Sequence, residues 1–315
     1  MRLQFLDYRG VYRNMIRDGS YMGEIATEEK SMIFRIRFAK YGVVKFIGHL
    51  DVMRYFQKAV RRSGLPIKYS QGFNPHQLMV FAQPLGVGVT SDGEYMDIET
   101  EDADFDGNEL NSERVREILG AALTEGFEIV SIREIPWQEG TKHPENAMSL
   151  VAGADYVMSL KDGYVLRRIP GREYTDPDVI CSGDETGEPD PESYGHAGYL
   201  SVKLKEFLEK DSIVVSKKSK SGQTDMDIKP YIYEAAVTDN KTVPQFMDEL
   251  GTAHADLYAP GVRFFFRLSA GSAVNIKPEL VLEAFMEFCG FEHDEFAFQI
   301  HRAQMYSDVL HVVGL

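Results

Sequence analysis

The sequence predicts an α+β protein made of two ferredoxin-like lobes in tandem. In the first half the expected elements follow the order strand, helix, strand, strand, helix, strand, with one further strand-like run between the helices, and the second half can be interpreted in the same way. The chain has 315 residues, more than the roughly 100–200 residues of a usual single domain. Two diverged copies of one βαββαβ unit account for all three observations.

The first strand is predicted over 33–38, where apolar residues alternate with arginines. A helix follows from Gly48, with Leu50, Met53, Phe56 and Val60 expected on its apolar face. The run Ser63-Gly64-Leu65-Pro66 ends this helix with a glycine cap and a proline. The remaining elements are strands over 67–70, 78–82 and 94–99, a helix capped by Ser112, and a strand over 127–132.

The second half is predicted as a diverged repeat of the first. Its expected strands cover 156–160, 213–217, 231–237, 262–268 and 296–300. One helix carries Leu200, Leu204 and Phe207, and another has Pro278 in its first turn and ends at Gly290.

The domain boundaries follow from these elements. From 173 to 196 the chain has eight acids and neither lysine nor arginine, which is typical of a mobile insertion that cannot bury enough apolar area to fold. The predicted parts are an N-terminal extension 1–31, a first lobe 32–137, a linker 138–153, and a second lobe 154–315 with the acidic insertion at about 161–198. Whether Met1 or Met32 is the true start stays open.

The charge is unevenly distributed. The net charge is −15, which by itself disfavours nucleic acid, because phosphates are bound mainly by lysine and arginine. Between Ile33 and Gln83, however, nine basic residues face a single acid, a local formal charge of +8. An acidic protein with one strongly basic region is therefore compatible with a phosphate-bearing ligand.

The first candidate site is the basic helix and the segment leading into it. Lys45 and His49 stand at its start, where free amides and the helix dipole favour an anion, and His49 is also a candidate general acid or base. Arg54 and Arg61 follow on the polar face. The alternative is an ordinary solvated helix face with a histidine at its cap.

The second candidate is the loop Tyr69 to His76. Tyr69 and Phe73 are suited to stacking on a flat ligand. Gln71, Asn74 and His76 can form hydrogen bonds to the edges of such a ligand, and Gly72 allows the backbone to approach it closely. His76 is the other candidate catalytic histidine. The alternative is a wide hairpin turn with Phe73 packed beneath it.

The third candidate is the lysine-rich loop of the second half, with Lys218, Lys220 and Lys229. It suits an anion, although lysines at a hairpin tip also keep a sheet edge soluble. No metal site is predicted, because the two cysteines, Cys181 and Cys289, are far apart and other metal-ligand and phosphate-loop patterns are missing.

At Gly48-His49-Leu50-Asp51 and Lys68-Tyr69-Ser70-Gln71-Gly72-Phe73-Asn74-Pro75-His76 the chain resembles the bacterial radical-SAM-linked family of unknown function. The similarity starts near Met32 and is strongest through about Ile98, and Asp227-Ile228-Lys229-Pro230 resembles a later motif of that family. The resemblance implies a radical SAM protein as partner. The chain itself is not expected to be the radical SAM enzyme, because two cysteines cannot supply the three-cysteine cluster site; no cofactor is expected.

Three hypotheses about function remain open. The leading one is an accessory module that binds RNA or another phosphate-bearing ligand and cooperates with a radical SAM partner. The second is a metal-independent endoribonuclease on tandem ferredoxin-like lobes, with His49 or His76 as general base, although Ser269-Ala270-Gly271-Ser272 is a poor glycine-rich loop. The third is a protein-interaction scaffold. With neither a signal pattern nor a membrane span, a cytoplasmic protein without membrane contact is expected.

Overall fold

The computed structural model describes residues 31–137, 144–161, 164, 166–167, 169, 197–219, 222–238, 253–255, 262–309 and 313–315. Ser31–Leu315 form one compact unit. The predicted N-terminal extension up to residue 30, part of the predicted linker and most of the predicted acidic insertion lie outside the described residues. Within them, no helix has the length and apolar character needed to cross a membrane.

The first half begins with β1 (Met32–Lys40). Phe34, Ile36 and Phe38 are buried as the alternation predicts, but Arg35 on the opposite face is buried too. Its guanidinium makes an ion pair with Asp97, which also accepts the backbone N–H of Ala147. The half-buried pattern predicted for this strand is therefore wrong at Arg35, because a later segment of chain covers that face.

Helix α1 (His49–Ser63) follows the short 3-10 helix η1 (Gly42–Phe46). It ends where the sequence predicts, with Gly64 in the left-handed region at φ 74°. The buried residues are Val52, Phe56, Ala59 and Val60, so the apolar face is rotated from the predicted one. Leu50 is exposed instead of buried.

The rest of the first half consists of three strands and a helix. The elements are β2 (Met79–Phe81), β3 (Thr90–Thr100), α2 (Ser112–Gly120) and β4 (Phe127–Ile135). The N-cap of α2 is Asn111, whose side chain accepts the N–H of Arg114 at 2.9 Å, so the cap predicted at Ser112 is one residue off.

The second half starts with α3 (Ala147–Leu150) and β5 (Gly153–Leu160). Its further elements are α5 (Ala197–Glu209), β6 (Val214–Ser219), β7 (Gly222–Asp227), the 3-10 helix η3 (Lys229–Tyr231), β8 (Ile232–Thr238), β9 (Arg263–Ser269), α7 (Pro278–Cys289), β10 (Phe298–Asp308) and β11 (Val313–Gly314). Helix α7 has the predicted proline start and glycine end. Strand β7 pairs with β6 in a two-stranded sheet of its own, outside the main sheet.

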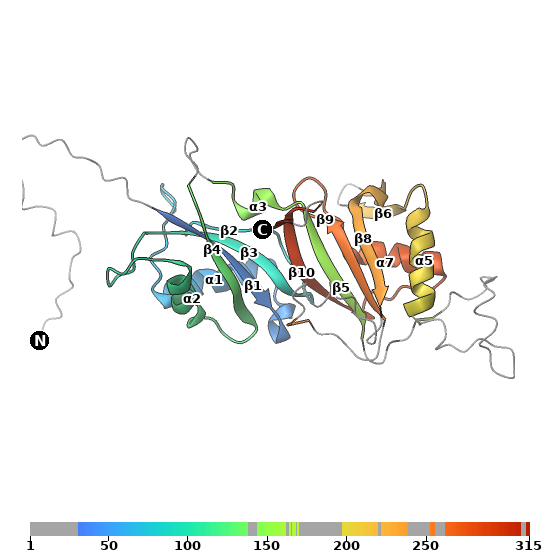
Figure 1. The fold of residues 1–315 in the computed structure, drawn as a ribbon, viewed down its shortest axis with the longest axis horizontal. Helices are drawn as coiled ribbons and strands as arrows, with labels where there is room; N and C mark the ends of the chain where they lie inside the picture. Colours follow the sequence, from blue (N-terminus) through green and yellow to red (C-terminus); the bar gives the residue numbers. More distant parts are fainter. Residues whose placement is uncertain are drawn as a thin grey trace, which may run out of the picture. The chain divides into compact units, whose positions relative to one another are not determined.

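The main sheet joins both halves (Figure 1). In the described residues nine strands belong to it, in the order β4-β1-β3-β10-β5-β9-β8, with β2 beside β3 and β11 beside β10. The pairing of β3 with β10 is parallel, and the other pairings are antiparallel. The protein is thus a mixed α+β fold with a large mixed sheet and, among the described residues, few helices.

Two features shape the junction between β3 and β10. Gly93 lies where the two strand backbones approach each other closely. A Cβ atom at this position would lie 2.5 Å from the Cα of Gln304, so only glycine allows this approach. The buried apolar residues of the described chain form two clusters, one around β1, α1 and α2 and the other around β5, α5 and α7. The second cluster includes Ala82, Leu85 and Tyr95 from the first half, so it extends across the junction.

Candidate functional site

The loop Tyr69 to His76 is held at its base. The N–H of Ser70 donates to the carbonyl of His76 at 2.8 Å, and the N–H of His76 donates to the Ser70 hydroxyl at 3.1 Å. The same hydroxyl lies 2.8 Å from Nδ1 of His76, and Tyr69 forms a β-bridge with Gln77. The loop therefore leaves the sheet from a fixed base.

The tip of this loop is exposed. The relative exposure of Phe73 reaches 111%, as much as in an extended chain, so the ring does not pack beneath the turn. Gln71 and Asn74 are exposed as well, and Tyr69 keeps 44% of its surface. Gly72 adopts φ 122°, which strains any residue with a side chain. The aromatic and amide groups are thus available to a ligand.

Helix α1 supplies the basic groups nearest in sequence to the loop. Arg54, Lys58 and Arg61 are exposed on its outer face. Arg54 lies 3.1 Å from Asp51 in a solvent-exposed pair, which weakens its charge only slightly because water screens such pairs. Arg61 stands in the last turn, shortly before the chain enters the loop.

Lys45 and His49 lie at the opposite end of α1. The Lys45 ammonium donates to Oε1 of Gln299 in β10 at 3.2 Å. The His49 ring meets Phe81, the last residue of β2, edge-on at 5.7 Å. Among the described residues no hydrogen bond, ion pair or ring contact joins His49 to the loop, so the two candidate histidines belong to separate places.

His49 is half-buried, and its surroundings set its protonation. Burial lowers the pKa of the imidazole, the Glu94 carboxylate raises it, and the charges of Arg302 and Lys40 lower it further. The net effect is a pKa below the ordinary value near 6.5. A neutral imidazole at neutral pH can accept a proton.

The described second-half lysines belong to elements other than the first loop. Lys218 lies on β6 opposite Gln223 of β7, outside the main sheet, and Lys220 is outside the described residues. Lys229 begins η3, and its ammonium donates to the carbonyl of Lys210. Within the part of the chain that the structure describes, no hydrogen bond, ion pair or ring contact links Lys229 to Tyr69–His76.

A family model described as "Uncharacterized protein conserved in bacteria" (DUF2344) matches residues 34–278, well over half of the chain. The chain belongs to this family. No curated protein matches it. The DUF2344 match contains α1, both candidate loops and all of β3, and it ends at the first residue of α7, so β10 lies beyond the matched residues.

Sequence reasoning missed a buried charged network where β10 meets β3. Arg302 donates to Glu94 through Nε at 2.8 Å and through Nη2 at 2.5 Å, and both side chains are buried. Lys40, also buried, donates to the carbonyls of Lys45 and Ile47 at 3.1 and 3.0 Å. The available signal was the density of acids in this one strand, with Asp92, Glu94, Asp97 and Glu99 among its residues.

A second group of interacting polar side chains lies around Asp92, close to this network in sequence. Asp92 is 2.5 Å from Nδ1 of His254 and 3.4 Å from Nε2 of His301. His254 also lies 3.2 Å from Glu128 and stacks on Tyr41 at 4.1 Å. These residues come from five separate stretches of chain, and no local pattern predicts their meeting.

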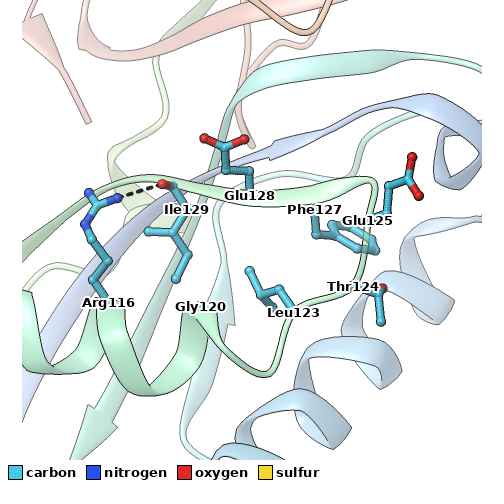
Figure 2. A pocket seen from close by; sticks show the side chains of 8 residues that line it. All are labelled: Arg116, Gly120, Leu123, Thr124, Glu125, Phe127, Glu128 and Ile129. Carbon is cyan, nitrogen blue, oxygen red and sulfur yellow. Dashed lines mark hydrogen bonds between the residues drawn. The ribbon is translucent and has the colours of Figure 1, made fainter.

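Figure 2 shows a pocket between α2 and β4 with a volume of about 390 Å³. Leu123, Phe127 and Ile129 line it together with Glu125 and Glu128, and the Glu128 carboxylate points away from it. Arg116 directs its guanidinium to the carbonyls of Ile129 and Val130 at 2.8 and 3.0 Å. Because this cation is already engaged, the pocket is a poor anion site, and no predicted site residue lines it.

In the described residues, no three His, Cys, Asp or Glu side chains are grouped so that they could hold a metal ion. Cys289 is buried in α7, and Cys181 lies outside the described residues.

Proposed function

We propose that this DUF2344 protein is an accessory module that binds RNA or another phosphate-bearing ligand and cooperates with a radical SAM partner. The observation that carries the proposal is Phe73, fully exposed at the tip of a loop whose base is fixed by Ser70 and His76. An aromatic ring held out from a rigid base is suited to stacking on a nucleobase. Gln71 and Asn74 beside it offer donors and acceptors.

The basic face of α1 supports the same reading. An RNA strand that stacks on Phe73 and Tyr69 would next contact Arg61 and Arg54 on the outer face of α1. Lys45 and His49 lie at the far end of the same helix. The 15 residues of α1 span roughly 22 Å, the length of several nucleotides. Lys218, Lys220 and Lys229 are proposed to hold a further anionic part of the ligand.

We also propose that the two halves are ferredoxin-like lobes in tandem. In the first half β4, β1 and β3 are neighbours with β2 beside β3, and in the second half the order is β10-β5-β9-β8. Each order is that of a ferredoxin-like unit when the strands are numbered along the chain, which supports two tandem lobes. The radical SAM partner rests on the resemblance in the residues around His49 and Phe73. Because the proposed ligand is RNA, we also propose a cytoplasmic location.

The test is a fluorescence-anisotropy titration of a labelled single-stranded RNA 12-mer at low salt. Loss of one stacking ring costs about 1–3 kcal/mol, so Phe73→Ala should weaken binding by about fivefold or more. Arg54→Ala with Arg61→Ala should weaken it further and flatten its salt dependence.

The matched control is Phe105→Ala, which removes another exposed aromatic from a loop of the same half and should leave the affinity unchanged. Unchanged binding in the triple variant Arg54→Ala, Arg61→Ala, Phe73→Ala would show that this surface is not the RNA site.

A second candidate function is a metal-independent endoribonuclease, favoured by the lowered pKa of His49. A neutral His49 would take the proton from a ribose hydroxyl, and His76 is the other candidate base. Incubation of the protein with end-labelled RNA in the presence of a chelator decides between the two functions: cleavage that His49→Gln abolishes supports the enzyme, and intact RNA supports the binding module. The third hypothesis, a protein scaffold, predicts no RNA affinity at all.

A further inference from the structure

Four large apolar side chains are exposed around the start of α1. Val43 and Phe46 of η1 keep 82% and 64% of their surface, and Leu50 and Val87 keep 64% each. We call Val43, Phe46, Leu50 and Val87 the η1–α1 patch. Single exposed apolar residues are ordinary, but a contiguous group marks an interaction surface.

The local structure brings these residues near one another. Val43 and Phe46 are three apart in a 3-10 helix, where such residues lie on the same side. Leu50 follows in the first turn of α1, and the N–H of Gly88 donates to the carbonyl of Lys45 at 2.8 Å, which brings the segment that carries Val87 against the end of η1. The four exposed residues therefore lie near one another in the fold although they come from two stretches of chain.

The patch is also rigid. The buried ammonium of Lys40 donates to the carbonyls of Lys45 and Ile47, the end of η1 and the residue after it. Gln299 of β10 accepts from Lys45 and donates to the carbonyl of Gly88 at 2.8 Å. Because both stretches are anchored to the sheet, the apolar side chains cannot turn inward without breaking these bonds.

The charges around the patch are mainly positive. The Lys45 ammonium lies 5.2 Å from the centre of the Phe46 ring. Helix α1 begins here with the positive end of its dipole, and its N-cap, Gly48, has no side chain to cap it. The acid of the first turn, Asp51, is paired with Arg54. A carboxylate on an apolar partner would complement this arrangement.

We propose that the η1–α1 patch is a docking surface for a partner protein that presents apolar side chains beside an aspartate or glutamate. Valine and leucine neither stack on bases nor bind phosphates, so RNA does not account for them. A second copy docked symmetrically would place Lys45 against the same positive patch. The inference rests on the proposed function only in its expectation of a partner, and it uses residues other than the RNA-stacking loop.

The test uses the full chain in the bacterium that carries its gene, with the photo-crosslinking residue p-benzoylphenylalanine in place of Val43. The expected product is an adduct with one partner protein whose crosslinked peptide, found by mass spectrometry, carries apolar residues next to an acid. Phe46→Ser should lower the adduct yield about tenfold or more, because buried aromatic residues dominate interface energies. The control position is Val202 on α5, also exposed, which should not yield this adduct.

A charge-reversal experiment with the purified partner completes the test. Lys45→Glu should weaken binding about tenfold, and changing the partner's acid to lysine should restore it. Adducts with a second copy, with RNA or with lipid, no adduct at Val43, or an adduct insensitive to Phe46→Ser would each overturn the proposal. Failure of the proposed function is seen separately, because Phe46→Ser should leave the RNA titration unchanged whereas Phe73→Ala should not.

Discussion

Arg302 of β10 and Glu94 of β3 form a buried, two-bonded ion pair across the junction of the two halves, with N···O distances of 2.8 and 2.5 Å. The guanidinium also approaches the carbonyls of Gln83 and Pro84, at 3.4 and 3.5 Å. Burial of Arg302 opposes its charge, but the nearby Glu94 carboxylate keeps the pKa of the guanidinium above its ordinary value. A buried charge of this kind is stable only while its partner remains.

Arg302→Met should therefore destabilise the protein by about 3–5 kcal/mol, because the buried Glu94 carboxylate loses its hydrogen-bonded counter-charge. Urea unfolding followed by circular dichroism measures the effect. The double variant with Glu94→Gln should recover part of the loss. The matched control is Arg54→Met, which breaks an exposed pair with Asp51 and should cost less than about 1 kcal/mol. Equal losses in the two single variants would contradict the importance of the buried pair.

Gly93→Ala should separate β3 from β10. Its new Cβ would lie 2.5 Å from the Cα of Gln304, and backbone cannot move aside as a flexible side chain can. We expect a loss of about 1–3 kcal/mol, the usual cost of overpacking. Gly198→Ala is the control, since nothing lies within 4 Å of its position on α5. A thermal melt in which both variants match the wild type would rule out the close approach.

The lowered pKa of His49 predicts a pH dependence of stability. The unfolded chain takes up a proton on this residue near pH 6.5, whereas the native chain resists it, because burial disfavours the imidazolium. The contribution of His49 to stability is therefore complete above about pH 6.5 and declines as the pH falls below it. His49→Gln should reduce the difference in unfolding free energy between neutral and mildly acidic solution. An unchanged difference would show that His49 titrates normally.

Asp104 should titrate at a pKa of about 2, below its ordinary value of 3.8. The N–H of Asn108 is the main cause, and the Asn108 amide and the Arg114 guanidinium add to it. The stabilisation is present above the ordinary value and is lost as the pH falls toward 2. Arg114→Gln should raise the pKa in an NMR titration of the carboxyl carbon, whereas Arg116→Gln should not. An unchanged Asp104 pKa in the Arg114→Gln variant would show that the guanidinium does not contribute to the lowered pKa.

Local patterns predicted α1 and α7 well. Apolar spacing and the following glycine lie within one short stretch, and both helices end at a left-handed glycine, Gly64 and Gly290. The apolar face of α1 was harder to predict: Leu50 belongs to the expected face but is exposed, because the sheet lies against Val52 and Phe56. The exposed loop around Phe73 was recognisable from its residue types alone.

The charged junction could not be predicted in this way. It depends on the parallel pairing of His301 with Thr90 and of Arg302 with Ser91, residues more than 200 positions apart. Strand register is set by long-range packing and not by the local sequence. The sequence placed Lys45 and His49 at the start of the basic helix and the loop after its end, and the structure has them at opposite ends of α1.

The sequence by itself determined the α+β class, the helix that carries Arg54 and Arg61, and the composition of the loop at Phe73, since periodicity, caps and turn residues act over a few positions. Only the tertiary structure decided that Glu94 and Arg302 meet in the interior and that Val43, Phe46, Leu50 and Val87 gather on the surface. Those juxtapositions depend on which strands pair and how closely they approach, and that depends on contacts between distant parts of the chain.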